Sequence, residues 1–106
     1  MRWYQFVAYF FGGAFLVNAI PHFVSGVSGR RFPTPFASPP GRGLSSAFVN
    51  VLWGALNLVI GYVLVFRVGT FNFRYTQDAL IVGVGGLLMA VNLTRAFAHL
   101  DKEGSK

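Results

Sequence analysis

The sequence predicts an all-α integral membrane protein with a small bundle of three transmembrane helices. Hydrophobic residues make up 54% of the chain and charged residues only 11%, whereas about 25% of the residues of a soluble domain are charged. The apolar residues also form long blocks, in place of the narrow stripe of a soluble amphipathic helix. At 106 residues, the chain is expected to form a single transmembrane domain.

Three apolar blocks are long enough to cross a hydrocarbon core, which takes about 20 helical residues. The predicted helices cover residues 3–24, 46–66 and 79–99. Ser45 or Ser46 is expected to cap the second helix and Thr76 the third, because hydroxyl side chains bind free backbone N–H groups there. Pro21 is expected to kink or end the first helix.

The first block has an alternative interpretation as a secretory signal peptide, with the small residues at 25–28 as a cleavage region. Its apolar stretch exceeds the usual 7–15 residues, and Arg2 alone supplies a positive charge before it. A retained helix is therefore favoured.

A Pro/Gly-rich loop over residues 26–45 connects the first two helices and holds four of the five prolines. Proline removes a backbone donor, so neither helix nor sheet is expected to persist here. One interpretation is an ordered lid that places Phe32 and Phe36 in the membrane interface. The lid interpretation assigns lipid phosphate contacts to Arg30, Arg31 and Arg42. The alternative is a stiff linker.

The basic residues predict an orientation. With three spans, one side of the membrane receives Arg2, Arg67 and Arg74. The other side receives Arg30, Arg31, Arg42 and, in the polar tail 100–106, Lys102 and Lys106. Because cytoplasmic segments carry the excess of Lys and Arg, the N-terminus is expected outside and the C-terminus in the cytoplasm. The net charge of +6 is dispersed over these flanks, which argues against a nucleic-acid interface.

Polar residues inside the predicted spans define a candidate ligand-binding site. They are Asn18, His22, Asn50, Asn57, Asn92, Arg95 and His99. Their positions along antiparallel helices place most of them in the cytoplasmic leaflet. Unpaired polar groups are costly in lipid, so these side chains are expected to face one another or a partner. The alternative is hydrogen bonding between helices, with Arg95 and His99 reaching the headgroups.

Small residues predict helix packing. The positions are Gly54 and Gly61 on the second helix, and Gly86 and Ala90 on the third. Membrane helices associate through such surfaces because small side chains let their backbones approach closely. The second helix is therefore expected to be central in the bundle, or to form a subunit interface.

The sequence contains no motif for catalysis. There is no cysteine, and no triad, metalloprotease or phosphate-loop pattern. The three acidic residues, Asp78, Asp101 and Glu103, fall at predicted interfaces or in the tail, and no metal site is expected. Haem ligation by His22 and His99 is conceivable, since both are predicted in one leaflet.

Two functions remain open from the sequence. The first is a non-enzymatic membrane protein that acts as a homo-oligomer or as an accessory subunit of a larger membrane complex. The second is a module that binds or transports a lipid headgroup or small anion in a polar pocket of the cytoplasmic leaflet. In both interpretations the partner that the sequence establishes best is the lipid bilayer.

Overall fold

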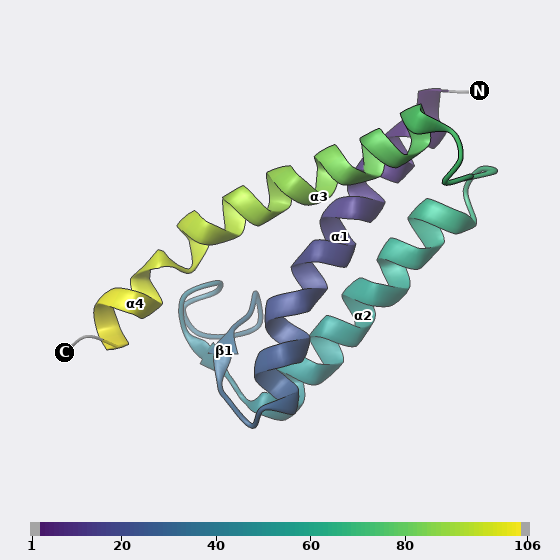
Figure 1. Cartoon of the computed structure of the whole chain (residues 1–106). Coiled ribbons are helices and arrows are strands. Elements are labelled where there is room, and N and C mark those ends of the chain that lie inside the picture. Colours follow the sequence, from purple (N-terminus) through teal and green to yellow (C-terminus); the bar gives the residue numbers. More distant parts are fainter. Residues whose placement is uncertain (1–2, 105–106) are drawn as a thin grey trace.

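Four helices make up most of the computed structural model, which describes residues 3–104, with side chains to residue 101. They are α1 (Trp3–Val27), α2 (Ala47–Phe66), α3 (Thr76–Ala96) and α4 (Ala98–Gly104) (Figure 1). Three helical segments, α1, α2 and Thr76–Asp101, are long and apolar enough to cross a membrane. Arg2 and Lys106, part of the predicted charge asymmetry, lie outside the described residues, as does the side chain of Lys102.

The side chains are distributed opposite to those of a water-soluble protein. Buried polar residues include His22, Thr34, Asn50, Asn57 and Asp78. Large apolar side chains on all three long helices point outward, among them Phe11 (51% exposed), Leu52 (54%) and Leu87 (65%). An apolar exterior over a partly polar interior is the arrangement expected of helices that face lipid.

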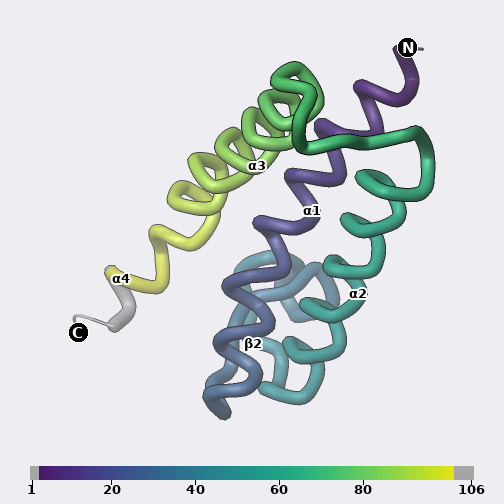
Figure 2. The backbone as a smooth tube through the Cα atoms, turned by 45° about the vertical axis from the view of Figure 1, so that its right-hand side comes forward, coloured from purple at the N-terminus to yellow at the C-terminus, as the bar shows by residue number. Residues whose placement is uncertain are grey.

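The central helix is α1. It packs along both α2 and α3, whereas α2 and α3 make little contact with each other (Figures 1 and 2). Two adjacent glycines allow this: a Cβ on Gly12 would lie 3.2 Å from the carbonyl oxygen of Gly61 in α2, and one on Gly13 would lie 3.1 Å from the backbone nitrogen of Gly86 in α3. The expectation that the second helix is central is therefore wrong, because only α1 presents glycine to both neighbours.

The helix ends agree only partly with the predicted signals. Ser46 caps α2, and its hydroxyl accepts a hydrogen bond from the backbone N–H three residues later at 3.2 Å. Thr76 is instead the first residue of α3, after Tyr75, whose side chain makes no capping bond. Pro21 does not end α1, which continues to Val27. Membrane helices tolerate proline where neighbouring groups satisfy the freed backbone.

The C-terminal half of α3 separates from the bundle. α3 packs on α1 near its N-terminal end, where Gly85 lies against the carbonyl of Phe10. Farther along, the two helices diverge, and α3 ends at Ala96, one residue before α4 begins (Figure 1). The predicted span 79–99 lies within the helical segment Thr76–Asp101, which a turn at Phe97 interrupts.

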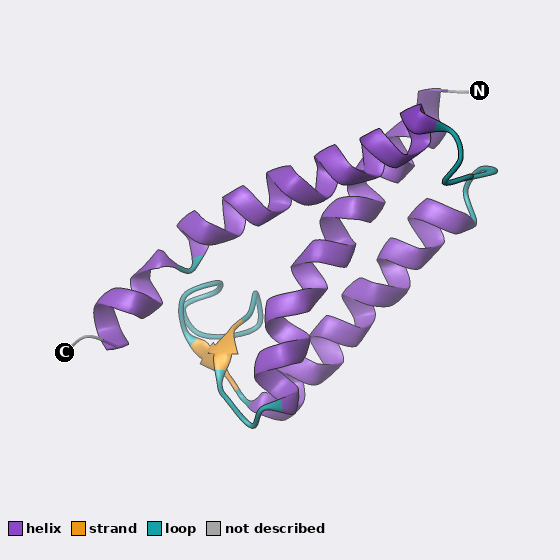
Figure 3. Ribbon diagram, in the orientation of Figure 1, coloured by secondary structure: helices purple, strands orange, loops and turns teal. Residues whose placement is uncertain are grey.

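The proline-rich loop is folded. Two short antiparallel strands, β1 (Phe32–Pro33) and β2 (Leu44–Ser45), close its base beside the ends of α1 and α2 (Figure 3). The carbonyl of Thr34 accepts hydrogen bonds from the N–H groups of Gly41 (2.9 Å) and Ala37 (3.2 Å). The expectation that no sheet persists here is wrong, because only Pro33 lies in the ladder and the other three prolines of the loop lie between the two strands.

Candidate functional site

An amide pair joins α1 to α2 inside the bundle. Nδ2 of Asn18 donates to Oδ1 of Asn57 at 3.0 Å. Nδ2 of Asn57 in turn donates to the carbonyl oxygen of Trp53, one turn earlier in α2, at 2.7 Å. Because a carbonyl can only accept, this second bond determines which end of the Asn57 amide carries nitrogen.

A histidine–amide pair joins the same helices nearer the loop. Nδ1 of His22 lies 2.9 Å from Oδ1 of Asn50, and both residues are buried. Nδ2 of Asn50 donates to the carbonyls of Phe32 at 2.9 Å, Ser46 at 3.1 Å and Ser45 at 3.3 Å. Three carbonyls around one nitrogen leave Oδ1 as the acceptor, so this network assigns the proton of His22 to Nδ1. Its Nε2 then carries a lone pair.

Aromatic rings surround the imidazole of His22. Phe32 from the loop, Trp53 from α2 and Phe97 from the end of α3 approach it edge-on, at centroid distances of 5.5, 6.3 and 5.9 Å. Phe32 and Phe97 also contact each other at 4.6 Å. The histidine therefore lies where all three long helices and the loop meet.

A small space, which we call the polar cavity, opens beside this histidine. Asn18 and His22 of α1 line it together with Trp53 and Phe97. The loop contributes Pro33, Thr34, Pro35 and Gly41. Its volume is about 180 Å³. No charged side chain is among its lining residues in the described part of the chain.

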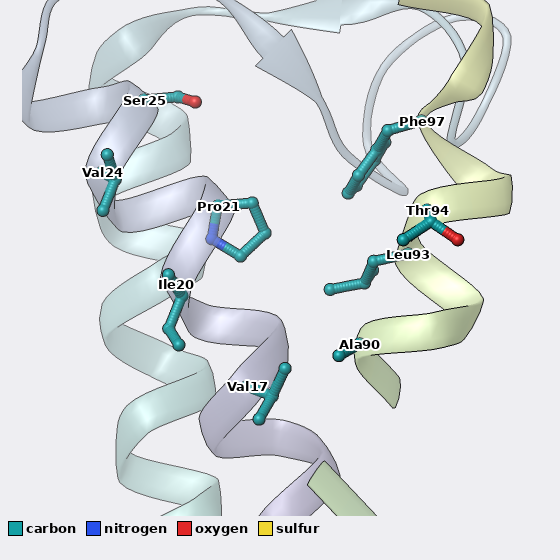
Figure 4. Close-up of a pocket in the computed structure, with 9 residues that line it drawn as sticks. All are labelled: Val17, Ile20, Pro21, Val24, Ser25, Ala90, Leu93, Thr94 and Phe97. Atoms are coloured by element: carbon teal, nitrogen blue, oxygen red, sulfur yellow. The ribbon is translucent and has the colours of Figure 1, made fainter. Parts of the chain in front are cut away.

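A larger space, which we call the apolar groove, lies between α1 and the diverging half of α3. Val17, Pro21 and Val24 line it from α1 and face Ala90, Leu93 and Phe97 (Figure 4). Its volume is about 430 Å³, and the residues that line it carry no charge. Phe97 lines both spaces, so the apolar groove and the polar cavity are neighbours.

The predicted polar cluster forms only in part. Asn18, His22, Asn50 and Asn57 come together, but Asn92 and Arg95 are exposed on α3. Nδ1 of His99 lies 3.1 Å from the carbonyl of Ala96, and His99 lines neither space. Neither the polar cavity nor the apolar groove is therefore lined by both histidines, as haem ligation there would require. The divergence of α3 and its break at Phe97 separate these residues from the cluster.

The predicted packing residues lie within the fold. A Cβ on Gly54 would come within 2.8 Å of the backbone nitrogen of Phe23, and one on Gly61 within 2.6 Å of the Leu16 side chain. Gly86 faces α1, and Ala90 lines the groove. The small face of α2 thus contacts α1 in the same chain. The loop residues Arg30, Arg31 and Arg42 are all exposed.

Three residues of the site, and one at the opposite end of the molecule, were missed from the sequence. Trp53 lies three residues after Asn50 and four before Asn57, a spacing that places all three on one helix face and could have identified it. Phe97 and Thr34 carried no comparable signal. Asp78, expected at an interface, is completely buried in the first turn of α3, where it accepts a hydrogen bond from the N–H of Asn72 at 3.2 Å.

No protein-family model matches the sequence, and comparison with curated proteins and with solved structures finds no significant similarity.

Proposed function

We propose that this chain is an integral membrane protein that binds an amphiphilic molecule between α1 and α3, beneath the proline-rich loop. The observation that carries the proposal is the pairing of two uncharged spaces. The polar cavity presents hydrogen-bonding groups of Asn18 and His22, and the apolar groove begins at the other side of Phe97. A molecule with a polar end and a hydrocarbon chain matches both spaces, with its polar end in the polar cavity and its chain in the apolar groove.

The chemistry of the two spaces supports this ligand class. Binding sites for small molecules are mostly apolar, with a few polar groups that orient the ligand. Nδ1 of His22 is engaged by Asn50, but Nε2 has no hydrogen-bond partner among the described residues. The network behind His22 holds the ring in place, and the folded loop closes one end of the cavity. The site is therefore largely preformed.

This proposal differs from the anion site considered from the sequence. Arg95, the expected fixed charge, is exposed and lines neither the polar cavity nor the apolar groove. Without a cation, a buried anion would lose its hydration and gain no ion pair. An uncharged polar end is therefore favoured.

The experiment is purification in mild detergent, followed by native mass spectrometry and lipid analysis of the bound molecules. Ala90→Phe should fill the apolar groove and lower the bound amphiphile by a factor of several. Val91→Phe is the matched control, because Val91 is the next residue on α3 and is exposed outside the groove. Equal occupancy in both variants, or no bound amphiphile in the unmodified protein, would contradict the proposal.

A second candidate function is a non-enzymatic oligomer or accessory subunit of a membrane complex. Asn92 supports it: its amide is exposed and makes no hydrogen bond within the described chain. An amide exposed to lipid raises the free energy of the protein unless a neighbouring protein forms hydrogen bonds with it. Crosslinking in native membranes should then give a discrete complex that Asn92→Leu weakens. A product at the monomer mass alone would contradict this function.

The proposed orientation places the proline-rich loop and the C-terminus in the cytoplasm. Arg30, Arg31 and Arg42 lie on this side and outnumber Arg67 and Arg74 in the opposite loop. The positive-inside rule favours the side with more basic residues. The polar cavity then lies in the cytoplasmic leaflet.

A further inference from the structure

We propose that the polar cavity selects a hydroxyl-bearing headgroup, and that its occupant is a lipid whose headgroup ends in glycerol. This inference rests on the proposed binding of an amphiphile and names the chemistry of its polar end. It follows from the direction of the hydrogen bonds behind the cavity.

Both cavity residues of α1 are left with a free acceptor. Asn57 gives its N–H to the carbonyl of Trp53, so its Oδ1 accepts from Nδ2 of Asn18. The atom that Asn18 does not use within the described chain is therefore Oδ1. By the same reasoning Nδ1–H of His22 donates to Asn50, and Nε2 remains as a lone pair. Asn18 and His22 are four residues apart, hence on one face of α1.

Two acceptors side by side require a ligand that donates. A phosphodiester or a carboxylate has no proton to give at neutral pH and would face the lone pairs of Oδ1 and Nε2. An ammonium group donates, but no carboxylate lines the polar cavity. The loop that lines the polar cavity also carries the exposed Arg30, Arg31 and Arg42, which add positive charge to that loop. Hydroxyl groups meet the requirement without charge.

The indole N–H of Trp53 also favours a hydroxyl over an ammonium group as the polar end of the ligand. Trp53 lines the polar cavity, and its Nε1–H has no acceptor among the described residues. A hydroxyl oxygen accepts a hydrogen bond as well as donating one, whereas an ammonium group only donates. Because Nε1 is itself buried, the indole must turn toward the polar cavity for a hydroxyl to reach it.

The sizes of the two spaces favour a lipid over a free polyol. The polar cavity, at about 180 Å³, is large enough for a glycerol group, and the adjoining apolar groove of about 430 Å³ is suited to acyl chain. A glycerol phosphodiester lipid would bring its diol to Asn18 and His22. Its phosphate, which links the diol to the acyl chains, would lie between the two spaces, beside Phe97.

The experiment uses Trp53 as the reporter. The chain has two tryptophans, so Trp3→Phe leaves Trp53 as the only one. This variant is reconstituted in phosphatidylcholine nanodiscs with added phosphatidylglycerol, or with phosphatidylethanol, which has the same charge and no headgroup hydroxyl. Phosphatidylglycerol should shift the Trp53 emission and remain bound in native mass spectrometry with a preference of roughly fivefold to tenfold, the ratio expected for one or two hydrogen bonds.

A pair of histidine variants tests the acceptor directly. His22→Phe keeps an aromatic ring and removes Nε2, so the preference should disappear. His99→Phe makes the same change outside the polar cavity and should keep the preference for phosphatidylglycerol. Circular dichroism checks the fold of both variants. If His22→Phe does not fold, the comparison of phosphatidylglycerol with phosphatidylethanol in the Trp3→Phe protein still tests the hydroxyl assignment.

The remaining outcomes separate this inference from the proposed function. Equal binding of the two lipids would overturn the hydroxyl assignment and leave amphiphile binding intact. Absence of both lipids and of any other bound amphiphile would overturn both. Free glycerol that shifts the Trp53 emission in phosphatidylcholine alone, to the extent seen with phosphatidylglycerol, would overturn the assignment to a lipid.

Discussion

Asn50 has the largest structural role of any single side chain in the site. Its amide nitrogen binds three carbonyls at the base of the loop and the start of α2, while its oxygen holds His22. One residue therefore connects α1, α2 and the loop. Such a group lowers the free energy of the fold only when all of its partners are present.

We expect Asn50→Leu to loosen the proline-rich loop. The change leaves the buried Nδ1–H of His22 without its acceptor, at a cost of about 1–3 kcal/mol, and removes the bonds of the Asn50 amide to three carbonyls. Trypsin should then cut faster at Arg30, Arg31 and Arg42. Asn92→Leu, on the exposed face of α3, is the control and should leave the cleavage rate unchanged. An Asn50→Leu protein with the native cleavage rate would contradict this role.

A second polar group lies at the opposite end of the molecule. The hydroxyl of Tyr9 and Oδ1 of Asp78 are both buried and have no hydrogen-bond partner among the described residues. The Tyr9 ring itself is well packed, edge-on to Phe71 at 5.3 Å. The aromatic ring and not the hydroxyl therefore accounts for the packing of Tyr9.

We expect Tyr9→Phe to keep the melting temperature or raise it. Removing an unpartnered hydroxyl relieves a desolvation cost of about 1–3 kcal/mol, and the ring contacts remain. Thermal unfolding in detergent measures the effect, with Tyr62→Phe on the exposed face of α2 as the control. A clear fall in melting temperature for Tyr9→Phe alone would mean that the hydroxyl is bound by a group outside the chain.

At the scale of whole elements, glycine determines which helix is central. α1 approaches α2 and α3 through adjacent glycines, and the glycines of α2 receive α1 side chains. Gly83 of α3 differs from these, because a Cβ there would meet no atom within 4 Å. Glycines in one bundle therefore have unequal structural importance.

Gly54→Leu should destabilise the bundle, whereas Gly83→Leu should not. At Gly54 the added side chain collides with the backbone of Phe23, and overpacking of this kind costs about 1–3 kcal/mol. At Gly83 it extends into open space. Melting temperatures of the two variants give the comparison, and equal destabilisation by both would count against the packing described for α1 and α2.

The sequence was sufficient to predict three long apolar helices and a meeting of polar residues from the first two, but not which of these residues pair. Asn18, His22, Asn50 and Asn57 could be found because polar groups inside apolar blocks must bind one another. The order of the helices predicts that Asn92, Arg95 and His99 lie at the same depth as this cluster, but it does not determine whether α3 packs on α1 at that depth. The divergence of α3 depends on tertiary contacts, and the burial of Asp78 on a loop fold that composition does not reveal.

At the scale of the whole molecule, the loop and the C-terminal helix lie at one end, and the N-terminal end of α1 lies with the second connection at the other (Figures 1 and 2). This arrangement follows from an odd number of long helices. It predicts that the polar cavity is accessible from one side of a membrane only.

Single cysteines test that topology, and the natural chain contains none to interfere. Ser38→Cys in the proline-rich loop and Asp101→Cys in α4 should react with an impermeant maleimide from the same side. Thr70→Cys in the second connection should react only from the opposite side, and all three positions are exposed. Labelling of Ser38→Cys and Asp101→Cys from different sides would exclude a three-span arrangement.

The contact between Phe32 and Phe97, at 4.6 Å, has a consequence for access. It joins the loop to the free half of α3 at the end of the apolar groove, and the rest of that groove is bounded by two diverging helices. In a bilayer such an opening faces sideways, so a guest molecule arrives by diffusion within the leaflet. Occupancy should then follow the mole fraction of the guest in the membrane, and its concentration in water should matter only through partitioning.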